Sequence, residues 1–337
     1  MQQNDFNRLD VSKKPPGSAV SSARPVNGRQ PIATRLNLVL ICVVLGGTLF
    51  QLFGMPFVLH DFGMRAAWLL LPIMLLQPLH WGLIHEAIHF QLLPNRRANE
   101  FFARLMSVTL GLPFDGTRFG HMVHHQFSRH GRDRPDVYDG RDPYLLAWLR
   151  YRVRLFGGVY LALLVTPLIA CIPMSLGARL MEKFIPVHDD GDAEVRRLFV
   201  SLVRNTPKRR RTRREFAMTL TLYGASAWIY GARWPMLLAA MYVRGVWHSF
   251  ADNAAHHGVP FNKSERARNF ALPRVFRPFV MNHHLHLTHH LYQAVPWTSL
   301  VSTSERDDER PNDNYFRAAF RQIDRSYPRA PDMIGRA

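Results

Sequence analysis

Residues 66–89, AAWLLLPIMLLQPLHWGLIHEAIH, join a long apolar run to a pair of histidines, and this stretch decides the fold. Its first part, 66–84, contains no Lys, Arg, Asp or Glu. A helix of about 20 such residues is long enough to cross a bilayer core of roughly 30 Å. His85 and His89 follow directly and lie one helical turn apart. The stretch therefore predicts a transmembrane helix that ends in a candidate metal site.

The motif HEAIH at 85–89 allows two interpretations. As HExxH it is the zinc-protease pattern, in which two histidines hold one zinc ion and Glu86 would act as the base. As HxxxH it is a pair of histidines one turn apart, which many metal sites use. The remaining histidines must decide between the two.

Composition favours a membrane protein over a nucleic-acid-binding one. The chain has 337 residues, is 47% hydrophobic and carries a net charge of +18. Such a charge is common in proteins that bind nucleic acid, but here the basic residues flank long apolar runs, as in a membrane protein with a basic cytoplasmic rim. We therefore expect no nucleic-acid partner. Cys42 and Cys171 lie inside apolar runs and are expected to pack there, without forming a disulfide or binding a metal.

The charge pattern divides the chain into three parts. Residues 1–34 are polar and lack periodicity, which predicts a disordered N-terminal tail. Residues 35–300 contain the apolar runs and form a membrane domain. Residues 301–337 form a polar C-terminal tail.

The apolar runs predict an all-α, integral membrane helical bundle. Segments long enough to cross give about four transmembrane helices: 36–59, 66–84, 216–232 and 234–250. Pro167 and Pro173 divide the run 155–178, for which we favour a re-entrant or interfacial hairpin. With the N-terminal tail and the basic run 207–214 on the cytoplasmic side, the histidines lie in a cytosolic helical cap.

Histidine is abundant, with 17 copies, and most of them fall in short boxes. The motifs HMVHH (121–125) and HLTHH (286–290) repeat the spacing HxxHH, which places three rings on one helix face. A catalytic zinc takes three protein ligands, so this many imidazoles suit two metals, and a protease would leave both HxxHH boxes unexplained. The candidate ligands from the three boxes are His85, His89, His121, His124, His125, His286, His289 and His290.

With these three boxes, the chain resembles the membrane fatty acid desaturase and hydroxylase superfamily. Members of that superfamily are integral membrane di-iron enzymes. Their histidine boxes have the patterns HxxxH or HxxxxH, HxxHH and HxxHH, in this order along the chain. The similarity extends through HHQFSRHGRDRPD (124–136) and NHHLHLTHHLYQAVP (282–296) and covers residues 40–300. It implies a desaturase-like domain at 35–300 and two iron ions held by the box histidines. The family often has one more histidine after the second membrane hairpin, and we favour His256 over His257 for it.

The resemblance also implies the chemistry. Two irons with O2 as co-substrate would oxidise an unactivated C–H bond of a fatty acyl or lipid chain. The segment 282–296 is most similar to acyl desaturases, so we expect desaturation. Lipid or alkane hydroxylation and oxidative decarboxylation to a terminal alkene stay open, and an intramembrane zinc metalloprotease stays a remote alternative. No catalytic residue beyond the metal ligands is assigned.

The sequence also leads to expectations for the electron donor, the membrane and the residues around the metal site. The chain contains no haem motif of the HPGG or CxxCH type and no cysteine cluster, so a separate electron donor of ferredoxin or cytochrome type is implied. Arg96, Arg97 and 208–214 would steer that donor. The enzyme is expected in membrane lipid of a bacterial inner membrane, with its site facing the cytoplasm. Candidate acceptors for the ligand rings are Glu86, Asp133, Asp136 and Asp252, and candidate substrate-lining aromatics are Trp68, Trp81, Phe114, Phe119, Trp247 and Trp297.

Overall fold

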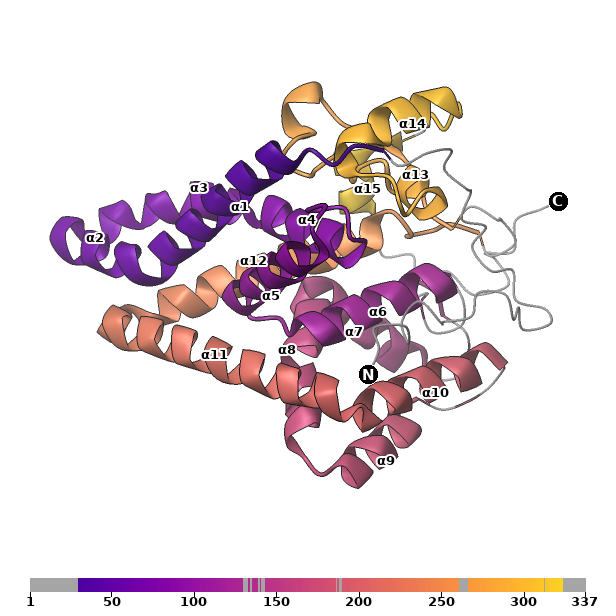
Figure 1. The fold of residues 1–337 in the computed structure, drawn as a ribbon, viewed down its shortest axis with the longest axis horizontal. Coiled ribbons are helices and arrows are strands. Elements are labelled where there is room, and N and C mark those ends of the chain that lie inside the picture. The colour runs from indigo at the N-terminus through magenta and orange to yellow at the C-terminus, as the bar shows by residue number, and fades with distance from the viewer. Residues whose placement is uncertain are drawn as a thin grey trace.

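A computed structural model describes residues 30–323, with gaps at 130–132, 134, 139, 141–142, 186, 188–189, 261–265 and 312. Most of the predicted N-terminal tail, up to residue 29, and the end of the chain from residue 324 lie outside the described residues. Apart from loops and turns, the described residues form helices and one pair of two-residue strands, so the predicted all-α class is confirmed (Figure 1).

The first helical hairpin contains the stretch that decides the fold. Helix α1 (Thr34–Leu49) continues through a π-helical turn at Phe50–Gly54 into α2 (Met55–Phe62). The chain reverses at Gly63, whose φ of +66° only glycine adopts readily. It returns through a 3-10 segment (Gly63–Leu69), α3 (Leu70–Leu75) and α4 (Gln77–Ile88), and α4 ends at the first histidine pair (Figure 1).

The second hairpin is formed by α11 (Thr206–Tyr230) and α12 (Trp234–Ala254), joined by a 3-10 turn at Gly231–Arg233. It corresponds to the helical hairpin predicted over 216–250. Its tip packs against the first hairpin, because Ser226 Oγ donates to the Leu52 carbonyl at 2.8 Å and the Tyr230 hydroxyl donates to the Gln51 carbonyl at 2.6 Å. Figure 1 shows both hairpins projecting to the same side of the molecule.

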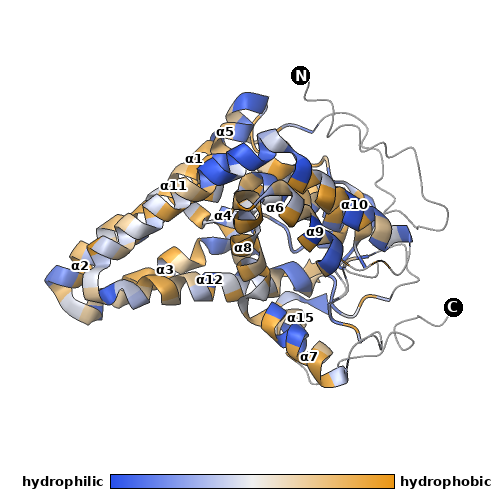
Figure 2. Cartoon of the chain, turned by 90° about the horizontal axis from the view of Figure 1, so that it is seen from below, coloured by the Kyte–Doolittle hydropathy of each residue, from blue (hydrophilic) through white to orange (hydrophobic). Residues whose placement is uncertain are grey.

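The outer faces of these helices are apolar. Trp68 in the first hairpin and Trp228 in the second are 78% and 83% exposed. Exposed apolar surface of this extent indicates contact with lipid. Figure 2 shows apolar residues along α1, α3 and α8, and hydrophilic residues gathered around α9, α10 and α15.

Two described helical stretches are long and apolar enough to cross a membrane, Thr34–Ile88 and Tyr144–Cys171. The first includes both arms of the first hairpin. These two stretches are consistent with membrane association, whereas the predicted bundle of about four crossings is not confirmed and stays a prediction.

The apolar run 155–178 forms two helices. After α7 (Tyr144–Val153) the chain bends within a π-helical segment (Arg154–Gly158) and enters α8 (Val159–Cys171); it breaks at Pro173 before α9 (Met174–Phe184). Pro167 lies inside α8 without ending it. Figure 1 shows α8 lying across the direction of α11 and α12.

The remaining helices form the cap that positions the histidines. They are α5 (Arg96–Leu110), α6 (Phe114–Phe127), α10 (Asp190–Arg204), α13 (His286–Leu291), α14 (Leu300–Arg306) and α15 (Tyr315–Arg321), with 3-10 turns at Arg274–Phe276 and Trp297–Ser299 and a parallel strand pair, β1 (Phe270–Ala271) and β2 (Asp313–Asn314). The main core joins α4, α5 and the segment before α13 through Leu83, Ile84, Met106, Phe114 and Met281, all fully buried.

Part of the predicted polar C-terminal tail, 301–337, is folded. Gln322, just after α15, donates from its side chain to the Phe250 carbonyl of α12 at 3.1 Å, and its own carbonyl accepts from the Tyr151 hydroxyl at 3.2 Å. These contacts hold α15 against α7 and α12, while the domain boundary at residue 300 stays a prediction.

Candidate metal centre

Nine imidazoles converge beside the ends of α4, α6 and α13. They form two clusters, and within each cluster one ring nitrogen from every histidine lies within 4.8 Å of those of the others. The five-histidine cluster contains His85, His89, His121, His125 and His289; the four-histidine cluster contains His124, His256, His286 and His290. The structure thus brings together all nine histidines that the sequence singled out.

Each HxxHH box contributes histidines to both clusters. In α6, His121 and His125 are one turn apart and serve the five-histidine cluster, while His124 points to the other. In α13 the division is reversed, with His289 in the five-histidine cluster. The clusters are neighbours, because the rings of His125 and His290 stack with centroids 4.2 Å apart.

The Nε2 atoms of these rings face one another. In the five-histidine cluster the Nε2 of His121 lies 2.9 Å from those of His89 and His125. In the four-histidine cluster the Nε2 of His256 lies 3.1 Å from those of His124 and His286. A neutral imidazole has only one N–H, so hydrogen bonds alone do not explain this convergence of nitrogens, whereas shared cations would.

Unpartnered nitrogens also fit metal binding. Both ring nitrogens of His85, a member of the five-histidine cluster, are buried without a hydrogen-bond partner among the described residues. Buried polar atoms of this kind are rare and call for an explanation such as a missing ion. Five and four nitrogen donors suit two transition-metal ions, although imidazole binds iron, zinc, copper and nickel alike.

Two rings of the four-histidine cluster are tied to the protein through their other nitrogen. His124 Nδ1 lies 2.7 Å from Asp133 Oδ2, a predicted acceptor. His256 Nδ1 lies 2.6 Å from the Arg266 carbonyl and 3.2 Å from Ser128 Oγ. Such contacts fix the orientation of metal-binding histidines. Neither the Arg266 carbonyl nor Ser128 could be predicted, because any residue supplies a carbonyl and a single serine carries no pattern.

The geometry favours His256 over His257. His257 belongs to neither cluster, and its ring stacks on Tyr151 at a centroid distance of 6.5 Å. His248 belongs to neither cluster, and its ring packs edge-on against Trp81 with the ring centroids 4.4 Å apart.

The Glu86 carboxylate contacts residues on both sides of α13 in the chain. Its Oε2 accepts from the Trp297 backbone N–H at 3.0 Å, and its Oε1 lies 3.3 Å from His283 Nε2. Because His85 and His89 share their cluster with three further histidines, HEAIH lacks the open coordination position that a catalytic zinc with three protein ligands keeps. Of the other predicted acceptors, Asp136 pairs with Arg129 and Asp252 lies 3.7 Å from Arg154.

Burial keeps most of the ligand rings neutral. It lowers the pKa of His289 and His290 well below the usual value, and neighbouring histidines lower it further. Burial acts in the same direction on His124, but the carboxylate of Asp133 outweighs it and raises the pKa of that ring. Neutral imidazole is the form that binds a metal.

An apolar cavity of about 410 Å³ opens onto the centre at His121 and His124. Its walls come from α6, α8 and α10. A smaller cavity, about 80 Å³, is lined by histidines of both clusters and shares His121 and His124 with the large one. Of the predicted lining aromatics, Trp81 and Phe119 line the large cavity and Trp247 the small one. Trp68 is exposed, Phe114 lies in the core, and Trp297 is buried with its indole N–H donating to Asn37.

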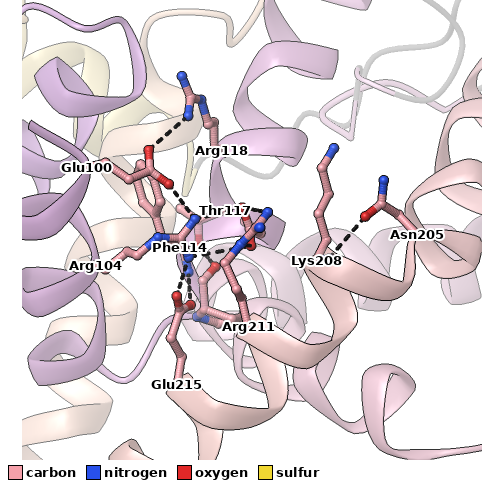
Figure 3. A network of polar contacts seen from close by, with 11 residues as sticks. Glu100, Arg104, Phe114, Thr117, Arg118, Asn205, Lys208, Arg211 and Glu215 are labelled. Atoms are coloured by element: carbon pink, nitrogen blue, oxygen red, sulfur yellow. Dashed lines mark hydrogen bonds and ion pairs between the residues drawn. The ribbon is translucent and has the colours of Figure 1, made fainter. Parts of the chain in front are cut away.

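A network of ionic groups fixes the start of α6 (Figure 3). Arg104 of α5 contacts the carboxylates of Glu100, Asp115 and Glu215, and Arg211 Nε donates to Asp115 at 2.8 Å. Glu215 of α11 also accepts from the Phe114 backbone N–H at 3.0 Å. The network therefore joins α5 and α11 to the helix that carries three of the candidate ligands, and the sequence did not reveal it.

Comparison with curated proteins and with solved structures finds no match. The fatty acid desaturase family, in contrast, matches residues 62–321. This match spans all three histidine boxes, His256 and the residues that line the large cavity. Because it covers most of the chain, the chain belongs to the fatty acid desaturase family.

Proposed function

We propose that the chain is a membrane di-iron oxidoreductase that uses O2 to oxidise an unactivated C–H bond in a fatty acyl or lipid chain, with desaturation as its reaction. One observation carries the proposal: two adjacent clusters of imidazole nitrogens lie at the end of a cavity with apolar walls. The clusters fit two metal ions, and the cavity fits a substrate that offers only hydrocarbon for recognition.

The nine histidines would hold the two irons, five at one site and four at the other. When bound there, the pair would supply the chemistry that activates dioxygen for attack on a C–H bond. The protein orients the rings of the four-histidine cluster through Asp133 and the Arg266 carbonyl. The apolar walls exclude water and present the chain beside His121 and His124.

Membership of the desaturase family favours loss of two hydrogens over the other outcomes of C–H oxidation. Hydroxylation and oxidative decarboxylation to a terminal alkene would use the same residues, and product analysis distinguishes them. The zinc protease interpretation of HEAIH has no support in the geometry, since Glu86 is engaged by Trp297 and His283.

The surroundings of the enzyme are part of the proposal. Two helical hairpins would make four crossings of a bacterial inner membrane, with α8 lying along the bilayer because it runs across the hairpins (Figure 1). The basic start of α11 would lie at the cytoplasmic face, as would the metal centre. Electrons would come from a separate ferredoxin or cytochrome.

The test is metal and product analysis of the enzyme purified in detergent. We expect two iron ions per chain and, with saturated fatty acyl substrates, O2 and a reducing system, an unsaturated product. His289→Ala should lose iron and product, while His60→Ala, at an exposed histidine paired with Asp61, should keep both. One zinc per chain together with peptide cleavage would overturn the proposal.

A further inference from the structure

Helix α6 presents two glycines to the large cavity on the same side as a candidate metal ligand. Gly116, Gly120 and His124 follow one another at intervals of four residues, so they lie on one helix face. All three line the cavity. The helix that carries the HMVHH box therefore has a face without side chains that leads to the metal centre.

Backbone geometry does not require glycine at these two positions. Glycine is a poor helix former, and neither residue has the positive φ that would favour it. At Gly116 close packing gives a reason, because a Cβ there would lie 3.2 Å from Thr166 Cγ2 of α8. At Gly120 packing gives none, since a Cβ would meet no atom within 4 Å. Gly120 therefore faces open space directly beside the ligands.

The cavity is elongated along α8. Its lining residues on that helix run from Val159 to Ala170, a distance of about 16 Å at 1.5 Å per residue. Leu163 of α8 and Leu202 of α10 are among its apolar walls, and Arg209 of α11 lies among the residues at its far end. This shape suits a single extended hydrocarbon chain.

We propose that the glycine face of α6 determines which acyl chains the enzyme accepts, with Gly120 leaving room for the segment of an unbranched chain that passes the metal centre. The inference rests on the proposed function for its substrate class. It makes Gly120 a specificity-determining residue: a larger side chain there narrows the passage and shortens the longest chain that fits.

The experiment compares Gly120→Leu with Gly224→Leu. Gly224 lies inside α11, has no atom within 4 Å of an added Cβ and does not line the cavity, so it is a matched control for placing leucine at a helical glycine. Purified iron-loaded enzyme is titrated with saturated fatty acids of increasing length, and binding is measured by the rise in Tm. Products from the same series are measured in parallel.

For Gly120→Leu we expect affinity for the longest fatty acids to fall about ten-fold or more, the scale set by a few methylenes in a pocket. Affinity for the shortest, the iron content and the ligand-free Tm should match those of Gly224→Leu. Gly120→Ala adds only a Cβ in open space, so it should fold as the unmodified chain does and shift the length limit in the same direction by less. If Gly120→Leu does not fold, the length limit measured for Gly120→Ala tests the inference.

An unchanged length limit in the folded Gly120 variants would overturn the inference. Failure of the proposed function gives a different result: no fatty acid is oxidised by the unmodified enzyme, yet the binding limit still moves in the Gly120 variants. If the unmodified enzyme forms product and the variants keep its length profile, the inference alone fails.

Discussion

The five-histidine and four-histidine clusters both draw on the HMVHH and HLTHH boxes, but they are supported differently. In the five-histidine cluster, every ring-nitrogen contact of hydrogen-bond length among the described residues joins one histidine to another. In the four-histidine cluster, Asp133 and the Arg266 carbonyl hold two of the rings from outside.

The difference follows from where the rings lie in the fold. His85 is at the end of α4, whose neighbouring residues Leu83, Ile84 and Ala87 are fully buried in the core, so helix packing alone fixes the ring. His256 lies beyond Ala254, the last residue of α12, and no helix fixes its direction. The direction of the His256 ring therefore depends on the Arg266 carbonyl and Ser128, whereas His124 has the support of both α6 and Asp133.

The largest effect is expected from removing His256, a tethered ring of the four-histidine cluster, altogether. His256→Ala should release iron from the four-histidine cluster and lower activity more than about 100-fold, since even residues that only orient ligands cost 10–100-fold. His257→Ala, one position along and in neither cluster, should keep iron and activity within about two-fold. Iron per chain and turnover measure both variants, and the opposite ranking would assign the ninth ligand to His257.

The next effect should reach both clusters equally, because it acts on the helix they share. Arg104→Met leaves the carboxylates of Glu100, Asp115 and Glu215 without their common partner and should lower the free energy of unfolding by about 3 kcal/mol. The control is Arg197→Met, at an arginine that is 66% exposed and pairs with Glu194; it should cost less than about 1 kcal/mol.

Chemical unfolding in detergent, with iron measured at each step, follows both arginine variants. Loss of iron from one cluster only in Arg104→Met would show that the network does not act through α6.

Part of the fold and of the metal centre could be predicted from the sequence. The eight box histidines could be predicted as candidate ligands because i, i+3 and i+4 spacing places rings on one helix face, whereas His256 was predicted only through the family resemblance. The hairpins followed from uncharged apolar runs. Asp133 could be predicted as an acceptor because it lies nine positions from His124, inside the segment that resembles the family.

Other features had no local signal. The division of each box between two clusters depends on how α4, α6 and α13 cross, which spacing within one helix does not encode. Arg104 and Glu215 are 111 positions apart, and each alone is an ordinary helical charge. Prolines in 155–178 indicated a break but not its place, since Pro173 ends a helix and Pro167 does not.

A smaller effect should separate the clusters. Asp133→Asn keeps the size of the side chain but weakens the acceptor for His124, so iron affinity of the four-histidine cluster should fall about 10–100-fold, while the five-histidine cluster keeps its iron. Asp61→Asn is the control, because Asp61 also contacts a histidine, His60, at 2.9 Å but on the surface. Iron titration monitored by spectroscopy distinguishes the two sites. Equal loss of iron from both clusters would show that Asp133 does not support the four-histidine cluster selectively.

The last effect concerns acid, and the sign of each ring's contribution depends on whether a carboxylate contacts that ring. Burial lowers the pKa of His289 and His290 in the folded protein, so below their ordinary pKa of about 6.5 the unfolded chain binds more protons. Metal-free protein should therefore lose stability as pH falls from about 6.5 to 5, by up to about 1.4 kcal/mol per pH unit for each ring that stays neutral.

His124 opposes this trend, because Asp133 outweighs burial and raises the pKa of that ring, and its contribution is present in acid and lost as pH rises through the folded pKa. Asp133→Asn removes the opposing contribution and should steepen the acid loss of Tm in chelator-treated protein. If the Tm of either protein at pH 5 equals or exceeds its Tm at pH 6.5, the prediction is wrong. The rings without a carboxylate partner would then accept protons in the folded state.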